Sequence, residues 1–280
     1  MKGKTPRIRS GKGFHAKQAL GQHFLSDASL LDELVALSGI GPEDQVFEIG
    51  PGLGALTEAL LRTGCRVLAM EVDPQLIPVL RVTLHGYEKV EIMEGDVMAP
   101  GLEKLLAPLG PFKIAANLPY YITTPILNRL LSLRLPILSI NVMVQKEAAE
   151  RLTAGPSTPA YGPLALLAQY QAEPSIVKII GAEKFTPPPK CDSAFVTMKM
   201  RQNPPVDAQE GPLFRLIETG FRMRRKTLLN NLIPAYSLSR AEVEELLKQA
   251  GLPADVRGEA LSLEQYALLS NLIAERQQKG

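Results

Sequence analysis

Val46-Phe47-Glu48-Ile49-Gly50-Pro51-Gly52-Leu53-Gly54 combines an apolar run with closely spaced glycines. The apolar run predicts a buried strand, and the glycines, Gly50 and Gly52 above all, predict a tight turn whose backbone can approach a ligand closely. A helical pattern near Leu56 to Arg62 comes next. Strand, glycine-rich turn and helix in this order are typical of the cofactor-binding unit of a doubly wound α/β sheet.

Further strand-like runs alternate with helical patterns up to about Met200. The runs are Val67 to Met70, Val90 to Met93, Phe112 to Ala116, Ile137 to Val144, Ile176 to Ile180 and Ala194 to Met200, with helical patterns near Leu76 to Leu84 and Ile126 to Leu133. This alternation predicts an α/β fold with a mostly parallel sheet and helices on both faces. The last two runs have no long helix between them and can form an antiparallel pair at one edge.

The pattern changes to helices alone near the C-terminus. Gln202 to Pro212 has the composition of a linker. Beyond it, Ser239-Arg240-Ala241-Glu242 and Ser262-Leu263-Glu264-Gln265 have the form of capping boxes, each at the start of an amphipathic helix. We therefore divide the chain into a basic N-terminal segment (1–25), an α/β domain (26–204) and a small all-α domain (205–280).

The composition, 45% apolar and 21% charged, is that of an ordinary globular protein of 280 residues. Leu135 to Val144, the longest uncharged stretch that suggests a membrane span, is too short, and the N-terminus lacks the apolar core of a secretory signal. Cys65 and Cys191 lie far apart and form no metal-ligand spacing with the three histidines. We expect a cytoplasmic protein with reduced thiols, no disulfide and no metal site.

Two acidic residues follow later strands, at the same edge of the predicted sheet as the glycine-rich turn. Glu71 ends the second strand, about 20 residues after Gly50, where a carboxylate can accept hydrogen bonds from ribose hydroxyls. Asp96 follows the third strand and can accept from an adenine amino group, with Val97 packed against the ring. The turn alone leaves NAD and S-adenosylmethionine open as cofactors, because it also satisfies the loose dinucleotide pattern.

Two features favour S-adenosylmethionine over NAD. Glu48 lies beside the turn, where it can hold the amino group of a bound amino acid but would repel a pyrophosphate. Asn117 to Tyr120 has no role in hydride transfer, and the sequence shows no paired catalytic residues of a dehydrogenase.

Asn117-Leu118-Pro119-Tyr120 follows the strand-like run that ends at Ala116, so it lies where open α/β sheets bind their ligands. Its groups suit the exocyclic amine of adenine, whose lone pair is delocalised into the ring. The amide oxygen of Asn117 and the carbonyl of Leu118 can accept the two N–H bonds of that amine. Pro119 holds the carbonyl in an extended pose, and Tyr120 offers a stacking face. The alternative is a strand-end turn in which the asparagine caps the next helix.

Two other segments suit contact with a nucleic acid. Phe185 to Ser193 contains a proline run that can hold Phe185 as a second aromatic wall for an unstacked base, or can be a rigid connector. The expected RNA-binding cations are Arg222, Arg224, Arg225 and Lys226, together with Lys2, Lys4, Arg7, Arg9, Lys12 and Lys17 near the N-terminus. The alternative for these cations is a solvated helix face and a basic tail.

Taken together, these segments resemble the bacterial small-subunit ribosomal RNA adenine dimethyltransferases, often called the kasugamycin-sensitivity methyltransferases. The matching segments are Leu20 to Leu25, Glu48 to Gly54, Glu71, Gly95-Asp96, Asn117 to Tyr121, Gln145 to Glu147, Glu150 to Leu152, Tyr161-Gly162, Phe185 to Ser193, Arg224 to Leu228 and Asn230 to Leu232. They cover almost the entire chain in order.

The resemblance implies a Rossmann-like fold and an S-adenosylmethionine-dependent enzyme that is monomeric. It implies N6,N6-dimethylation of two adjacent adenines in a hairpin loop near the 3′ end of 16S rRNA, in the immature 30S subunit. It also places cofactor contacts at His23, Leu25, Gly50, Glu71, Asp96 and Asn117. The family often has asparagine in place of His23, so we expect a backbone contact there. The alternatives are a 23S rRNA methyltransferase of the erythromycin-resistance type and a non-catalytic assembly factor.

Overall fold

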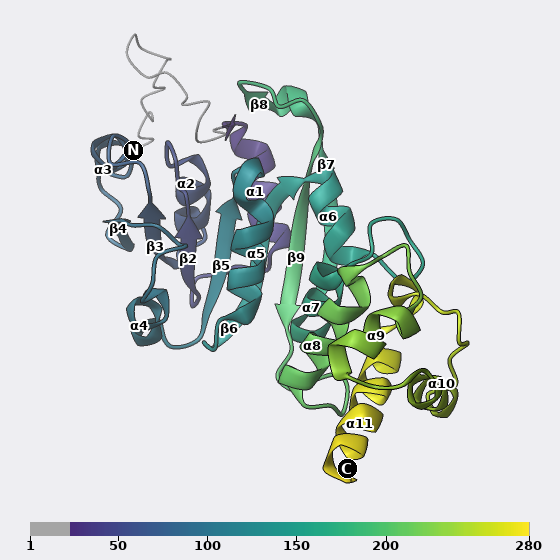
Figure 1. The fold of residues 1–280 in the computed structure, drawn as a ribbon. Coiled ribbons are helices and arrows are strands. Elements are labelled where there is room, and N and C mark those ends of the chain that lie inside the picture. Colours follow the sequence, from purple (N-terminus) through teal and green to yellow (C-terminus); the bar gives the residue numbers. More distant parts are fainter. Residues whose placement is uncertain (1–22, 280) are drawn as a thin grey trace.

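A seven-stranded sheet lies at the centre of the computed structural model, which describes residues 23–279 (Figure 1). Its strand order is β4-β3-β2-β5-β6-β9-β7. The strands are β2 (Gln45–Ile49), β3 (Arg66–Glu71), β4 (Val90–Glu94), β5 (Phe112–Asn117), β6 (Ile137–Gln145), β7 (Ala172–Ile180) and β9 (Ser193–Met200). The strands from β4 to β6 are parallel, whereas β9 is antiparallel to both β6 and β7. The predicted mostly parallel sheet with an antiparallel edge is confirmed.

Helices cover both faces of this sheet (Figure 1). They are α1 (Ala28–Leu37), α2 (Ala55–Arg62) and α3 (Ile77–Thr83) on one face, and α4 (Leu102–Leu106), α5 (Thr123–Ser132), α6 (Lys146–Thr153) and α7 (Pro163–Gln171) on the other. Side chains alternate between the faces, as a period of two requires. In β5, Ile114 and Ala116 join the apolar cluster that includes α5, whereas Ala115 joins the cluster of α1 and α2.

The C-terminal helices have an apolar cluster of their own. They are α8 (Glu210–Arg222), α9 (Leu228–Tyr236), α10 (Arg240–Gln249) and α11 (Leu263–Lys279), drawn in green to yellow in Figure 1. Helix α7 contributes Leu166 and Tyr170 to this cluster and Ala168 to the cluster of the sheet, so the two regions pack through α7. Ser239 and Glu242 form the predicted capping box, and Ser262 and Gln265 exchange the equivalent two hydrogen bonds.

A small second sheet, which the sequence did not predict, pairs the first described residues with a late segment of the chain. β1 (Phe24–Leu25) and β8 (Phe185–Thr186) are antiparallel, and Leu25 lies opposite Phe185. Single 3₁₀ turns occupy Ala107–Leu109, Tyr120–Ile122, Ala182–Lys184 and Gly258–Ala260. The segment Leu20 to Gln22 and the predicted N-terminal cations lie outside the described residues. None of the helices within residues 23–279 is long and apolar enough to cross a bilayer.

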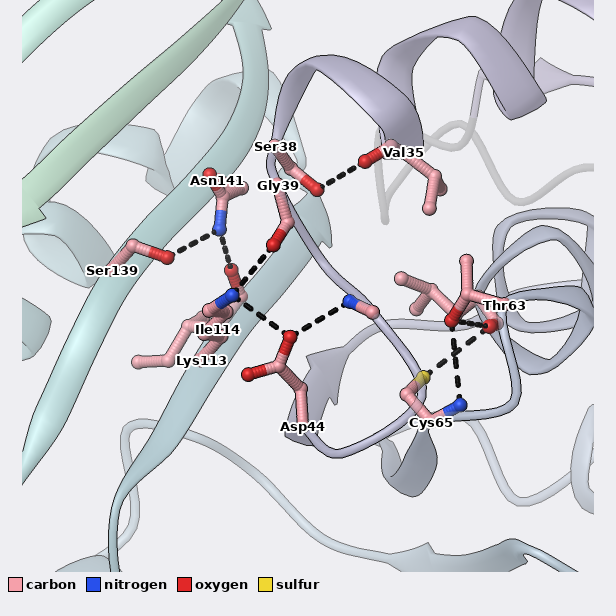
Figure 2. Close-up of polar contacts among 12 residues, drawn as sticks. Val35, Ser38, Gly39, Asp44, Thr63, Cys65, Lys113, Ile114, Ser139 and Asn141 are labelled. Carbon is pink, nitrogen blue, oxygen red and sulfur yellow. Dashed lines mark hydrogen bonds and ion pairs between the residues drawn. The ribbon is translucent and has the colours of Figure 1, made fainter.

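Polar contacts fix the connection between α1 and β2 to the amino-terminal end of β5 (Figure 2). Lys113 Nζ donates to the carbonyl oxygen of Gly39 at 2.7 Å and to Asp44 Oδ2 at 2.8 Å, and the same carboxylate oxygen accepts from the backbone N–H of Gly41. In the neighbouring strand, Asn141 donates to the carbonyl oxygen of Ile114 at 3.2 Å. These contacts hold the sheet at the end opposite to the candidate site.

Candidate active site

A cavity of about 150 Å³ opens at the carboxyl ends of the central parallel strands. The strand order reverses between β2 and β5, which is where open α/β sheets bind ligands. The cavity brings together ten of the predicted site residues: His23, Leu25, Glu48, Gly50, Gly52, Glu71, Asn117, Leu118, Pro119 and Tyr120. Both halves of the expected site therefore face the same space.

The glycine-rich turn closes one side of this cavity in a conformation that needs glycine. Gly50 and Gly52 have φ angles of +65° and +61°, in the left-handed region that other residues rarely adopt. A Cβ atom at Gly52 would also lie 3.0 Å from Cε1 of Phe24 in β1. The backbone can approach a ligand at positions 50 and 52, because neither of these residues carries a side chain.

Glu71, at the end of β3, is buried and held by backbone donors. Its Oε2 accepts from the N–H of Gly52 at 3.0 Å and its Oε1 from the N–H of Asp73 at 2.9 Å. A carboxylate has about four acceptor positions, so each oxygen can still accept a hydroxyl from a ligand. These two bonds fix the direction of the carboxylate toward the turn.

Glu48 is the least satisfied polar group of the cavity wall. Its side chain is 1% exposed, and neither carboxylate oxygen has a hydrogen-bond partner among the described residues. Burial raises the pKa of Glu48 to about 8. The nearby Thr57 hydroxyl offsets part of that shift, although its geometry falls outside that of a hydrogen bond. A buried carboxyl group without a partner fits a ligand with a positive charge, such as the ammonium and sulfonium groups of S-adenosylmethionine.

The acceptor tetrapeptide follows β5 directly and is anchored to the neighbouring strand. Leu118 donates its backbone N–H to the carbonyl oxygen of Met143 at 3.0 Å. The amide nitrogen of Asn117 donates to the carbonyl oxygen of His23 at 2.9 Å, which leaves the amide oxygen as an acceptor. Pro119 is extended, with φ −61° and ψ 132°. The asparagine amide therefore bonds the N-terminal segment, and α5 begins without a side-chain cap.

The ring of Tyr120 is held from two directions. Its hydroxyl shares a hydrogen bond of 2.6 Å with Oγ of Ser193, a buried residue at the start of β9. Its face stacks against the imidazole of His23, with ring centroids 5.2 Å apart. Nδ1 of His23 in turn lies 2.7 Å from the carbonyl oxygen of Pro187, which can only accept, so Nδ1 carries the proton. Tyr120 thus links the N-terminal segment, the proline run and β9.

Three predicted site residues do not line this cavity. Asp96 is exposed beyond β4, and its carboxylate accepts from the N–H of Met98 at 2.8 Å. Val97 is 5% exposed and packs in the cluster of α4 and α5. Phe185 was expected as a second aromatic wall, but the pairing of β8 with β1 turns its side chain into the apolar core, where it is 2% exposed.

Other cavity residues were not predicted. Phe24, Met143 and Phe195 reach the cavity from β1, β6 and β9. Only the register between strands brings them there, and a single sequence does not show that register. Tyr121 also lines the cavity, and the sequence predicts no role for it beyond its place in the family-like segment Asn117 to Tyr121.

The predicted basic cluster lies at the end of α8 and in the loop that leads to α9. Arg224 forms an ion pair within the protein, because its guanidinium lies 3.0 Å from Glu259 Oε2. Arg222, Arg225 and Lys226 are exposed, and the described residues give them no ion pair. Three of the four cations in this cluster are therefore available to a phosphate backbone.

Comparison with known proteins agrees with this geometry. A family model described as ribosomal RNA adenine dimethylase matches residues 13–275. The ribosomal RNA small subunit methyltransferase A of Geobacillus kaustophilus is 41% identical over 97% of this chain and 96% of its own. The protein of the same name from Lactococcus lactis is 39% identical over 96% of this chain and 94% of its own.

Solved structures extend the comparison to the three-dimensional fold. The crystal structure of the 23S rRNA methyltransferase ErmE has a TM-score of 0.70 and 25% identity, over 90% of this chain and 99% of that one. A dimethyladenosine transferase from Plasmodium falciparum shares the fold, with a TM-score of 0.74, 24% identity, and coverage of 92% and 98%. With the family model matching nearly all of its length, this chain belongs to the ribosomal RNA adenine dimethylase family.

Proposed function

We propose that this protein dimethylates N6 of two adjacent adenines in a hairpin loop near the 3′ end of 16S rRNA, with S-adenosylmethionine as methyl donor. The observation that carries this proposal is the single cavity that joins the unpartnered carboxyl group of Glu48 to the amide of Asn117. One group suits a cationic cofactor and the other suits an aromatic amine. Membership of the ribosomal RNA adenine dimethylase family supports both assignments.

In the cofactor half of the site, the chain's own groups provide recognition. S-adenosylmethionine, when bound, supplies an electrophilic methyl group on a sulfonium. The backbone of Gly50 and Gly52 allows close approach, and Glu48 takes the ammonium group of the methionine part. Glu71 accepts the ribose hydroxyls through its remaining lone pairs. His23, just before β1, and Leu25, within β1, line the cavity and would contact the cofactor there. Asp96, exposed just after β4 and outside the cavity lining, would accept from the adenine amino group, and the buried Val97 beside it would support the ring from the core.

In the acceptor half, two neutral oxygens activate the nucleophile. The amide oxygen of Asn117 and the carbonyl oxygen of Leu118 accept the two N–H bonds of adenine N6 and draw the nitrogen toward tetrahedral geometry. Tyr120 holds the base, and its own position is fixed by Ser193. The nitrogen becomes cationic on methylation and then releases a proton, so no strong general base is required. The contribution of the protein is orientation and preorganised electrostatics.

We further propose that the enzyme acts as a cytoplasmic monomer on the immature 30S subunit, late in its assembly. The helical region 205–280 then serves as an RNA-binding domain next to the α/β domain. Arg222 at the end of α8 and Arg225 and Lys226 in the loop after it support this role, because they are exposed and have no ion pair among the described residues. Contacts to phosphate position an RNA without reading its sequence.

The direct test is transfer of labelled methyl groups from S-adenosylmethionine to undermethylated 30S subunits. Nuclease digestion of the product should yield N6,N6-dimethyladenosine, with the label confined to two neighbouring positions of 16S rRNA. Incorporation of label at other nucleosides, or none with the wild-type protein, would contradict the proposal.

A second candidate is methylation of a single adenine in 23S rRNA, which the structural similarity to ErmE supports. Primer extension on both ribosomal RNAs from a deletion strain separates the two. Reverse transcriptase stops at the methylated adenines. Loss of this stop from 16S rRNA supports the first proposal, and loss of a stop from 23S rRNA supports the second. A non-catalytic assembly factor would leave both signals unchanged.

A further inference from the structure

Tyr121 is an exposed aromatic residue at the mouth of the cavity. It lies in the 3₁₀ turn Tyr120–Ile122, directly after β5, and it lines the cavity while remaining 61% exposed. Within residues 23–279, its ring makes no aromatic contact and its hydroxyl no hydrogen bond. Tyr120, one position earlier, is held by Ser193 and His23. The fold therefore fixes one tyrosine and leaves its neighbour open to a ligand.

The position of Tyr121 indicates which ligand covers it. Two other exposed apolar residues line the cavity, Leu53 and Val72, and they follow β2 and β3 on the cofactor side. Tyr121 follows β5, on the side of Asn117, where the target adenine of the proposed function would bind. Adenine can react in this cavity only after it has left its stack, and its neighbour in the strand then loses a stacking partner. Exposed aromatic rings commonly take the place of that partner in proteins that bind single strands.

We propose that Tyr121 stacks on the nucleotide adjacent to the target adenine. Consecutive Cα atoms lie about 3.8 Å apart, so Tyr120 and Tyr121 can serve two consecutive nucleotides of one strand. Stacking uses the face of the ring and not the hydroxyl. Tyr121 is thus a positioning residue for the RNA, and this inference rests on the proposed function.

Three substitutions separate stacking from other roles. Steady-state methylation of undermethylated 30S subunits should show a KM for the subunit about tenfold higher in Tyr121→Ala, as expected for loss of one stacked base. Tyr121→Leu should behave like Tyr121→Ala, because it keeps apolar area but no flat ring, and Tyr121→Phe should match wild type. In all three, kcat and the Kd of S-adenosylmethionine, measured by calorimetry, should stay within about twofold of wild type.

The matched control is Ile179→Ala, which removes an exposed apolar side chain of β7 that lies away from this cavity. It should leave the KM for the subunit unchanged. An unchanged KM in Tyr121→Ala, or a wild-type KM in Tyr121→Leu, would overturn the inference. The proposed function would still stand in that case, provided that the wild-type protein methylates 16S rRNA. If the wild-type protein transfers no methyl group to 16S rRNA, the proposed function fails and this inference with it.

Photocrosslinking identifies the group that covers residue 121. With p-benzoylphenylalanine substituted at this position, a crosslink to the nucleotide next to the target adenine is the expected result. A crosslink to a ribosomal protein, with none to RNA, would overturn the inference.

Discussion

Glu48 shows how one buried side chain couples the cavity to pH. The ordinary pKa of a glutamic acid is near 4.5, and that of Glu48 is raised to about 8, first by burial. The unfolded chain loses this proton near pH 4.5, whereas the folded, ligand-free protein keeps it until about pH 8. The contribution of Glu48 to the free energy of unfolding is therefore fully present below pH 4.5 and is lost as the pH rises through 8.

Glu48→Gln should remove this pH dependence. In the ligand-free variant, Tm should fall less than in wild type between pH 5 and pH 8. In wild type, a cationic cofactor favours the ionised carboxylate, so binding should release a proton at pH 7 and the affinity should rise toward pH 8. In Glu48→Gln the affinity should be weaker and this proton release absent. Calorimetry in buffers of different ionisation enthalpy measures the affinity and the number of protons released. Equal proton release in wild type and Glu48→Gln would contradict the role of Glu48.

Asn117 donates its amide N–H to the carbonyl oxygen of His23, and in the proposed mechanism its amide oxygen accepts from the substrate amine. Asn117→Ala should lower kcat by about 10²-fold or more, comparable to loss of one preorganised polar group in other active sites. Binding to immature 30S subunits should change little, because the substitution leaves the proposed phosphate-binding cations in place. Asn128→Ala, an exposed asparagine of α5, is the matched control and should retain full activity. Wild-type methyl transfer by Asn117→Ala in a single-turnover assay would rule out this role.

Among the secondary structure elements, the turn between β2 and α2 is the most constrained. Gly52→Ala adds a Cβ atom 3.0 Å from Phe24 and forces a left-handed residue, so it should weaken cofactor binding at least tenfold and lower stability by about 1–2 kcal/mol. Gly251→Ala has a similar φ of +68° with open space around it. It should cost comparable stability in thermal unfolding and leave cofactor affinity intact. Equal cofactor affinity in both variants would show that the contact with Phe24 is unimportant.

Helices and strands with a clear hydrophobic period were predictable from the sequence. Strands that exist only through pairing with a segment far along the chain were not. The strands from β2 to β9 of the main sheet, and helices α2, α3 and α5, follow from apolar runs and helical spacing. β1 and β8 have two residues each, too few for a pattern, and they exist only because they pair across the fold. The same pairing turns Phe185 into the apolar core. Because the sequence does not show this pairing, it gives no sign that the side chain points away from the cavity. Glu48, Glu71 and Asn117 all line the cavity, because strand ends in parallel sheets meet at one edge, and their roles toward cofactor and substrate stay predictions.

Among residues 23–279, Arg222, Arg225 and Lys226 form an exposed cluster of cations without ion pairs at the end of α8 and in the loop after it, and we propose that this cluster binds RNA. Neutralising Arg222, Arg225 and Lys226 together should weaken RNA binding and reduce the slope of log affinity against log salt by about 2. Arg224→Ala is the control. Because Arg224 already pairs with Glu259, its loss should change the slope less and cost at most about 1 kcal/mol of stability. Filter binding at several salt concentrations measures the slope, and no change in the triple variant would show that this loop faces away from RNA.

The pairing of β1 with β8 also has a consequence for protein synthesis. Phe24 lies opposite Thr186, 162 positions later, and Leu25 lies opposite Phe185, 160 positions later. A growing chain that has left the exit tunnel only as far as Tyr120 already holds the glycine-rich turn and the acceptor tetrapeptide. It still lacks Ser193 and Phe195, so the wall around the cofactor is incomplete. Nascent chains of this enzyme should therefore acquire S-adenosylmethionine late in translation, after β9 has emerged.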